Sequence, residues 1–449
     1  MIVSRFITLT IAALVVTTSL SAQPLYRTQI APYSKRSASA SADHSTDPLY
    51  VEFDPTLIAK KDGKSLYSKE FTYPVNWSDG LIVLHLENLP EEAVLLINEV
   101  AVTQIKDTLT PLDIDISDYL HQGENSIEIV TMGETSPLES EVDRVERKPF
   151  SSSYITSQGA LHIKDFVVSI VRDPEKGNAQ LWFDVIVDNR YPQPREVEIG
   201  FDIYDPTGKL IDYDFRTKEI GVDGVDTISF SRPIWGAAPY RWGVVGDGVT
   251  RKGVGSAQSS LYSLTLYTRL GGVLREYIPF KVGYTDFDVV DGKLTLFGKN
   301  VDIKSHYLLK SAATRQECQK ELLSLKNQGV NMIITKYPQP QFFYELTDQL
   351  GLLVIDGVSI NAPQESGNRA VGGTPANDPT LLDEYLSRGK AAYYRSRNHT
   401  SVVGYSLSGV ESGNGYNMYR LYETLRDSEP WRPIIYQGAQ GEWNSDVAF

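Results

Sequence analysis

The sequence contains a single cysteine, Cys318, among 449 residues, so no disulfide can form within the chain and stability has to come from buried surface. Basic residues are also scarce: 43 Lys and Arg stand against 57 Asp and Glu, a formal net charge of −14, which argues against a nucleic-acid partner. The few histidines show no metal-ligand spacing, because His306 and His399 have no nearby His or Cys to complete a set. We therefore expect neither a metal nor another cofactor.

Long apolar runs are absent beyond the N-terminus, since no later segment reaches the roughly 18 consecutive apolar residues of a membrane-spanning helix. Residues 1–22 have the order of a secretory signal peptide, with Arg5 before an apolar run from Phe6 to Val16 and small polar residues after it. We expect cleavage after Ser21 or Ala22 and a periplasmic or secreted protein. A buried N-terminal helix is the alternative, although no polar face interrupts the run.

The rest of the chain divides into a linker and three globular regions. Residues 23–47 include SKRSASASADHSTD, which lacks apolar periodicity and is predicted to be a linker. Residues 48–150 contain short apolar runs and predict a β-sandwich; from Leu112 to Ser117 apolar and polar residues alternate, typical of a half-buried strand. Residues 151–288 predict an immunoglobulin-like sandwich of about seven strands, with a tight hairpin at Gly271-Gly272.

From residue 289 onward, strands alternate with helices. Thr314 and Glu317 have the form of a capping box, Gly329 is placed to end that helix, and Asp378 is placed to cap a later one. Five apolar runs separated by helices predict a parallel sheet. These runs are 301–304, 330–334, 352–355, 401–407 and 433–436. Periodicity alone does not distinguish an open sheet from part of a barrel.

Several ordered segments carry a resemblance to a known family. They are LLINEVAV, LDIDISDYLHQGENSIEI, SSLYSLTLYTR, KVGYTDF, GKLTLFGKNVDIK, GVNMIITKYPQPQFFYELTDQLGLLVIDG, RNHTSVVGYSLSGVESGNGYN and RPIIYQG. Together they resemble glycoside hydrolase family 2, the β-galactosidase, β-glucuronidase and β-mannosidase family, from about residue 66 to the C-terminus. The resemblance implies a jelly-roll β-sandwich, an immunoglobulin-like β-sandwich and then a (β/α)8 TIM barrel, of which residues 289–449 would supply about five βα units.

The resemblance also implies a retaining mechanism, which needs two carboxyl groups about 5–5.5 Å apart. It places the acid/base at Glu411, in the loop after the fourth strand. The nucleophile of the family follows the seventh strand and has no counterpart in this sequence. Glu442 is the other late carboxylate near a strand end, and we expect it to be a surface or substrate-rim residue.

Other positions depart from the pattern of the family. Val410 stands where the family has an asparagine before the acid/base, and Gly357 stands where a glutamate closes the third strand. The segment from Asn331 to Pro338 lacks the arginine and the histidine of its motif, and an alkyl side chain cannot replace the donors of a guanidinium. These losses together suggest an altered site.

Polar and aromatic residues near the expected strand ends are the candidate sugar contacts. We assign substrate binding to Tyr405, Asn414 and Trp443, since sugar faces stack on aromatic rings; packing in the core is the alternative for the two aromatic residues, as for Tyr436. Five strands of eight would leave both sheet edges and the inner face uncovered. The leading interpretation is an exported, β-galactosidase-like glycoside hydrolase that is impaired or inactive as this chain. The alternatives are a non-catalytic carbohydrate-binding protein or a scaffold whose barrel is covered by a partner chain or oligomer.

Overall fold

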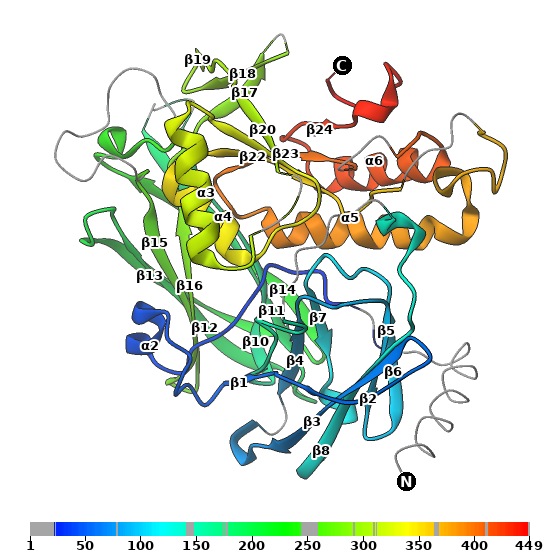
Figure 1. Ribbon diagram of the computed structural model, residues 1–449. Helices are drawn as coiled ribbons and strands as arrows, with labels where there is room; N and C mark the ends of the chain where they lie inside the picture. The colour runs from blue at the N-terminus through cyan, green and yellow to red at the C-terminus, as the bar shows by residue number, and fades with distance from the viewer. Residues whose placement is uncertain are drawn as a thin grey trace. The chain divides into compact units, whose positions relative to one another are not determined.

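A computed structural model of the chain describes residues 22, 24–77, 80–140, 148–173, 175, 178–243, 259–290, 292–308, 310, 312–362, 368–408 and 412–447 (Figure 1). The chain forms two compact units. The first contains Ala31–Pro137 with residues 24–26 and 148–161, and the second contains Arg27–Ile30, residues 138–140 and the chain from His162. Apart from Ala22, the expected signal peptide lies outside the described residues. Within the described ranges, no helix has the length and apolar character needed to cross a membrane.

The first unit is a β-sandwich of two sheets. One has the order β1 (Tyr50–Glu52), β9 (Tyr154–Gln158), β4 (Leu81–Leu86), β7 (Leu112–Asp115); the other has the order β2 (Thr56–Lys61), β3 (Lys64–Tyr73), β8 (Gly123–Thr131), β5 (Ala93–Ile97), β6 (Val100–Ile105). The central strands β4 and β5 are buried along their whole length, which fits their apolar sequences, interrupted in β4 by His85 alone. Because β9 pairs with β1 and β4, this unit continues to residue 161, past the boundary expected at 150.

The segment predicted to be a linker contains ordered structure. It includes the short helix α2 (Arg36–Ser41), and the ring of His44 stacks between Tyr33 at 3.7 Å and Tyr50 at 4.5 Å. The prediction is therefore wrong for this segment. The composition of residues 23–47 is too polar for the segment to fold alone. The stacking of His44 between Tyr33 and Tyr50 supplies the contacts that order it.

Asp113 of β7 is buried, contrary to the alternating pattern that predicts a solvent-facing carboxylate. The residue is 9% exposed, and its Oδ1 is 2.6 Å from Nδ1 of His85 on the neighbouring strand β4. A histidine 28 positions away in the sequence thus takes the place of water as the partner of this carboxylate.

The second unit begins with a sandwich of seven strands. One sheet has the order β10 (Leu161–Arg172), β11 (Ala179–Asn189), β14 (Gly224–Ile234); the other has the order β13 (Leu210–Ile220), β12 (Arg195–Tyr204), β15 (Tyr262–Leu270), β16 (Val273–Val282). Phe183 packs between Phe201 and Phe230 at ring distances of 4.9 and 4.6 Å in its core. The predicted hairpin is confirmed: Gly271 and Gly272 both have positive φ, 57° and 78°, as a tight two-residue turn requires.

A five-stranded parallel sheet follows, and it confirms the predicted alternation of strands and helices (Figure 1). Its order is β20 (Ser305–Leu308), β21 (Met332–Thr335), β22 (Leu353–Gly357), β23 (Val402–Ser406), β24 (Ile434–Ile435), with the helices α3 (Arg315–Asn327), α4 (Gln341–Leu350), α5 (Leu382–Ser396) and α6 (Tyr416–Ser428) between them. The first strand begins at Ser305 rather than Val301. The amide of Val301 instead donates to the carbonyl of Leu294 at 2.9 Å and extends a small antiparallel sheet of β17 (Phe287–Val290), β18 (Lys293–Leu296) and β19 (Lys299–Asn300).

The parallel sheet has apolar layers on both faces. The four helices cover one face in a large buried cluster, and Trp242 and Leu296 pack on the other face against Met332, Leu353 and Val403. The expectation that the inner face is uncovered is therefore wrong for this part of the sheet. The indole of Trp242 also donates to the carbonyl of Asp348 at 2.7 Å. This hydrogen bond holds Trp242 in position on that face of the sheet.

The helix termini follow the local sequence. The Thr314 hydroxyl accepts a hydrogen bond from the amide of Glu317 at 3.2 Å, and the Glu317 carboxylate accepts from the amide of Thr314 at 3.1 Å, which confirms the capping box. Asp378 caps as predicted, but it caps a 3-10 turn, η7 (Pro379–Leu381), from which α5 continues. Within the described residues, the other 3-10 turns are η2 (Val75–Trp77), η3 (Ser117–Tyr119), η4 (Pro137–Glu139), η5 (Ala238–Tyr240), η6 (Pro375–Asn377) and η8 (Gln437–Ala439).

Candidate functional site

The C-terminal ends of the parallel strands meet at one edge of the sheet. The loops after β22, β23 and β24 begin at this edge, and they carry closely spaced polar side chains that hydrogen-bond from loop to loop. Ligands of proteins with parallel sheets and flanking helices bind at this edge. This edge is therefore the candidate site.

Two serines tie the loop after β23 to the loop after β22. The Ser408 hydroxyl lies 2.7 Å from the Ser412 hydroxyl and donates to the carbonyl of Ile360 at 2.6 Å. The Ser412 hydroxyl also accepts from the amide of Ala362 at 3.1 Å. Both serines are buried, so Ser408 and Ser412 themselves are held against the loop after β22. Glu411, the expected acid/base, directly precedes Ser412 in the sequence and lies outside the described residues.

Asn414 is held by a reciprocal amide pair. Its Nδ2 donates to Oδ1 of Asn444 at 3.1 Å, and Nδ2 of Asn444 donates back to Oδ1 of Asn414 at 2.8 Å. Asn414 Nδ2 also lies 3.4 Å from Oε2 of Glu442. Asn444 is fully buried. It is not identified as a site residue from the sequence, because nothing in its local sequence marks it as the partner of a residue 30 positions away.

Glu442 is the centre of a charged cluster at the same edge. Its Oε1 accepts from Nη2 of Arg369 at 2.5 Å, and its Oε2 accepts from the hydroxyl of Tyr419. Hydrogen bonds from Arg369 and then Tyr419 lower the pKa of Glu442, and the bond to Glu442 raises the pKa of Arg369. The carboxylate is therefore ionised at neutral pH and paired with a cation, so it is suited to accept hydrogen bonds rather than to donate a proton.

Trp443 presents an aromatic surface beside this cluster. The residue is 56% exposed, and its indole stacks on Tyr419 with centroids 5.2 Å apart and planes 21° apart. Tyr422 makes an edge contact with the same indole at 5.6 Å. Because both tyrosines project from α6, the helix holds the exposed indole in a fixed position.

Tyr405 is a core residue, which corrects its assignment as a substrate contact. It is fully buried, and its ring lies 5.7 Å from the ring of Tyr393 on α5. The register of β22 and β23 shifts so that Val354 pairs with Val402 but Ile355 pairs with Gly404. This bulge turns the Tyr405 side chain to the helix-covered face of the sheet, where burial raises the pKa of its hydroxyl.

Tyr436 is also part of the helix-covered core. It is 1% exposed, and its hydroxyl donates to the carbonyl of Gly413. Of the aromatic residues near the strand ends that the sequence brings forward, Trp443 is the one that the structure exposes at the candidate site.

Asp356 is a buried carboxylate of β22 that faces the helices. Its Oδ1 accepts from the Thr335 hydroxyl at 3.0 Å and from the Tyr344 hydroxyl at 2.9 Å. Burial raises the pKa of Asp356 despite these hydrogen bonds. Its partners lie on β21, on α4 and, through Ser396, on α5, so this carboxylate joins the sheet to the helices rather than serving the candidate site.

Gly357 ends β22 at the position where the family resemblance expects a glutamate. A Cβ atom placed there would lie 2.3 Å from the carbonyl oxygen of Thr335, a contact with backbone that no side-chain rotation can relieve. The close approach of β21 and β22 therefore excludes any side chain at this position in the present structure.

We expect Gly357→Ala to lower the free energy of unfolding by about 1–3 kcal/mol, because β21 and β22 would have to separate. Chemical denaturation followed by circular dichroism measures this change. Gly221→Ala is the matched control, since a Cβ there would meet nothing within 4 Å, and it should leave stability unchanged or slightly higher. Equal free energies of unfolding for the two variants would show that β21 and β22 accommodate the added methyl group without loss of stability, which would contradict the prediction.

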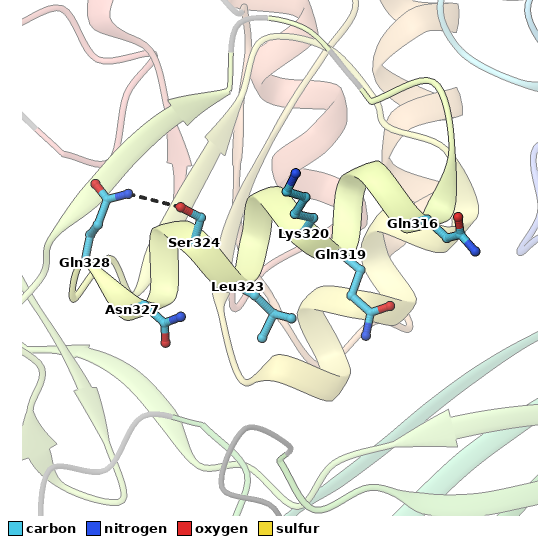
Figure 2. A pocket seen from close by; sticks show the side chains of 7 residues that line it. All are labelled: Gln316, Gln319, Lys320, Leu323, Ser324, Asn327 and Gln328. Atoms are coloured by element: carbon cyan, nitrogen blue, oxygen red, sulfur yellow. Dashed lines mark hydrogen bonds between the residues drawn. The ribbon is translucent and has the colours of Figure 1, made fainter.

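A shallow depression of about 560 Å³ runs along the outward face of α3 (Figure 2). Its described lining residues all come from this helix and the turn after it: Gln316, Gln319, Lys320, Leu323, Ser324, Asn327 and Gln328. No carboxylate is among them, so acid/base chemistry of the expected kind has no groups there. In the part of the chain that the structure describes, no cluster of three or more His, Cys, Asp or Glu residues could hold a metal ion.

Comparisons with known proteins identify what the chain is similar to. The model of the glycosyl hydrolases family 2 TIM barrel domain matches residues 300–448. A β-galactosidase from Priestia megaterium is 26% identical over 414 residues, which cover 87% of this chain and 38% of that protein. A β-galactosidase from Streptococcus thermophilus is 25% identical over 398 residues, which cover 86% of this chain and 36% of that protein.

Among solved structures, a β-glucuronidase from Bacteroides uniformis superposes with a TM-score of 0.66 at 16% sequence identity. The match covers 93% of this chain and 52% of that chain, and at this identity it shows a shared fold. The chain spans less than two fifths of the length of the two curated relatives.

Proposed function

Because the chain belongs to glycoside hydrolase family 2, we propose that it acts on O-glycosidic bonds of carbohydrates at the C-terminal edge of its parallel sheet. One observation carries this proposal: the buried Ser408–Ser412 contact, 2.7 Å long, holds these two residues at the edge where enzymes with TIM barrels hold their catalytic groups. The β-galactosidases among the relatives make a β-galactoside the first substrate to test.

In the proposed reaction Glu411 is the acid/base. It would protonate the leaving glycosidic oxygen while a second carboxylate attacks the anomeric carbon, and it would then take a proton from the water that releases the sugar. Glu442 does not fit the second role, because its negative charge is already paired with Arg369 and hydrogen-bonded by Tyr419, which weakens it as a nucleophile.

The family resemblance expects the nucleophile after a seventh barrel strand, whereas the described residues form five strands of this sheet. We therefore propose that the sheet is part of a barrel and that this polypeptide by itself hydrolyses glycosides slowly or not at all. A second candidate function is carbohydrate binding without turnover. The exposed indole of Trp443, stacked on the tyrosine that hydrogen-bonds Glu442, favours it.

The test is hydrolysis of nitrophenyl β-galactosides, β-glucuronides and β-mannosides by the 449-residue chain and by Glu411→Gln. We expect any hydrolysis to fall about 100-fold or more in the variant, the usual contribution of a positioned acid/base. Glu423→Gln is the matched control, because Glu423 lies on the exposed side of α6 in an ion pair with Arg420, and it should behave like the unchanged chain.

Hydrolysis that survives in Glu411→Gln would reject the assigned acid/base. A chain that binds oligosaccharides in isothermal titration calorimetry but releases no nitrophenol supports the binding function and rejects catalysis by this polypeptide alone. A chain with neither property rejects both candidate functions.

A further inference from the structure

We propose that Trp443 and the Arg369–Glu442 pair, with the buried Asn414 supporting Glu442, form a subsite for one neutral hexose ring of a carbohydrate chain. This inference rests on the proposed function and deepens it, because it adds residues that bind without reacting and names the charge class of the sugar. The four residues lie after β23, after β24 and before α5, and hydrogen bonds join three of them directly.

The aromatic half of the subsite is the exposed indole. A pyranose ring has an apolar face of C–H groups, and aromatic rings are the side chains that cover such faces. The Trp443 indole is 56% exposed and is already fixed by Tyr419 at 5.2 Å and by Tyr422 at 5.6 Å. Binding a sugar on it would therefore order few additional side-chain torsions.

The polar half is joined to the aromatic half through Tyr419. The ring of Tyr419 stacks on Trp443, while its hydroxyl donates to the carboxylate of Glu442. The side chains of Arg369 and Glu442 remain 54% and 34% exposed, so both can still reach a ligand. A guanidinium supplies donors and a carboxylate supplies acceptors, which together match the vicinal hydroxyl groups at the edge of a sugar ring.

The charges select a neutral sugar. Arg369 and Glu442 are paired at 2.5 Å, so their charges largely cancel and the subsite offers no uncompensated cation to an acidic sugar. A uronate would bring its own carboxylate next to Glu442, and like charges at such distances repel. The same pair can form hydrogen bonds with a neutral hexose while the ion pair between Arg369 and Glu442 stays intact.

Isothermal titration of the 449-residue chain with a neutral β-galacto-oligosaccharide tests the aromatic half. We expect Trp443→Ala to weaken binding by about three- to tenfold, the contribution of one well-placed aromatic contact. Trp431→Ala is the matched control: Trp431 is 86% exposed and lies just after the C-terminal end of α6, before β24. The Trp431→Ala variant should bind the oligosaccharide with the same affinity as the unchanged chain. Equal affinities of all three proteins, or equal losses in both variants, would overturn the proposal.

The charge argument is tested with a second ligand, an oligogalacturonide of the same length. The unchanged chain should prefer the neutral oligosaccharide, and Glu442→Gln should reduce this preference by about two- to fivefold because the repelling charge is removed. An unchanged preference, with near-ultraviolet circular dichroism showing a folded variant, would overturn the selectivity for neutral sugars.

The outcomes separate this inference from the proposed function. Hydrolysis that depends on Glu411, together with unchanged binding by Trp443→Ala and Glu442→Gln, would reject the subsite and retain the glycosidase activity. Binding that is lost in Trp443→Ala in a chain without hydrolysis would retain the subsite and reject turnover. The absence of any affinity for either oligosaccharide would reject both.

Discussion

Replacing Arg388 with alanine is expected to lower the free energy of unfolding of the second unit by about 3–5 kcal/mol. Arg388 is fully buried on α5, with Nη1 2.9 Å from Oε1 of Glu139 and Nη2 2.9 Å from Oε1 of Glu384. Alanine would remove the guanidinium that these two buried carboxylates share. It would also remove the donor that reaches the carbonyl of Ser359 at 2.6 Å.

Urea denaturation with hydrogen–deuterium exchange of the α5 amides measures this loss in the second unit. Arg420→Ala is the matched control, because Arg420 is 46% exposed in a surface ion pair on α6, and it should change stability by less than about 1 kcal/mol. Combining Arg388→Met with Glu139→Gln and Glu384→Gln should recover part of the loss, since no charge would then be buried unpaired. A loss no larger than that of the control would contradict the buried cluster.

The same cluster supports the candidate site. Ser359 and Asn361 belong to the loop after β22, and the amide of Asn361 donates to the carbonyl of Leu138 at 2.6 Å. Leu138 is itself buried in the helix-covered core. We infer that Arg388, which binds both this loop and Glu139, positions the loop without being a catalytic residue.

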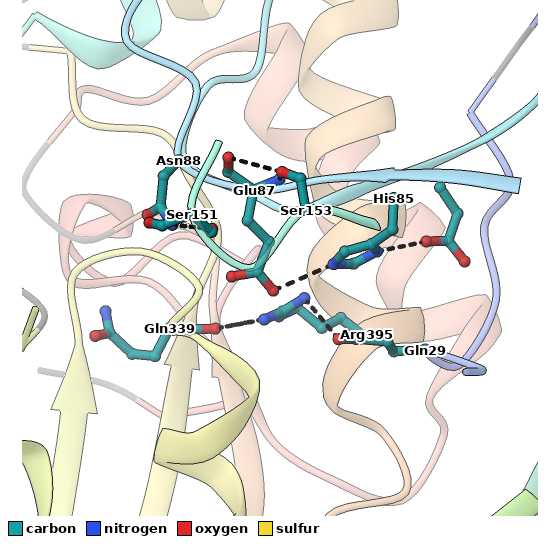
Figure 3. A network of polar contacts seen from close by, with 9 residues as sticks. Gln29, His85, Glu87, Asn88, Ser151, Ser153, Gln339 and Arg395 are labelled. Atoms are coloured by element: carbon teal, nitrogen blue, oxygen red, sulfur yellow. Dashed lines mark hydrogen bonds and ion pairs between the residues drawn. The ribbon is translucent and has the colours of Figure 1, made fainter. Parts of the chain in front are cut away.

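Replacing His85 with alanine is expected to lower the free energy of unfolding of the first unit by about 3 kcal/mol or more. His85 is 2% exposed on β4, with Nδ1 2.6 Å from Oδ1 of Asp113 and Nε2 3.2 Å from Oε1 of Glu87 (Figure 3). Its ring also stacks on Tyr154 at 4.4 Å. The variant would leave two carboxylates buried without this partner and would open a cavity beside the tyrosine.

The loss should depend on pH in a definite direction. Burial alone would lower the pKa of His85, but hydrogen bonds and charges of Asp113 and Glu87 outweigh it and raise the pKa. A group with a raised folded pKa stabilises the fold fully below its unfolded value, about 6.5 for histidine. This stabilisation is lost as the pH rises through the folded pKa.

The difference in stability between the unchanged chain and His85→Ala should therefore be larger at about pH 6 than at about pH 9. Hydrogen–deuterium exchange of the β4 amides at the two pH values measures it in the first unit. His121→Ala is the matched control, because His121 is exposed in the same unit. A difference that grows with pH would contradict the assigned pKa direction.

Much of the fold could be predicted because its signals are local. The capping box of Thr314 and Glu317 joins residues three apart, and the Gly271-Gly272 hairpin depends on the φ angles of two adjacent residues. The alternation of apolar runs with helical periods likewise needs no knowledge of distant contacts. Ordered motifs and local periodicity were therefore enough to predict the parallel sheet and to carry the resemblance to glycoside hydrolase family 2.

Which of these residues meet at a site depends on contacts between distant segments, and the sequence does not record those contacts. Arg369 and Glu442 are 73 positions apart, and Tyr405 faces the helices because of a bulge opposite Ile355. Asp113 is buried because His85 lies on the next strand. Composition and periodicity indicate which secondary structure each segment prefers. The partner of a charged side chain, or the face of a sheet that an aromatic ring occupies, depends instead on which segments the folded backbone brings together.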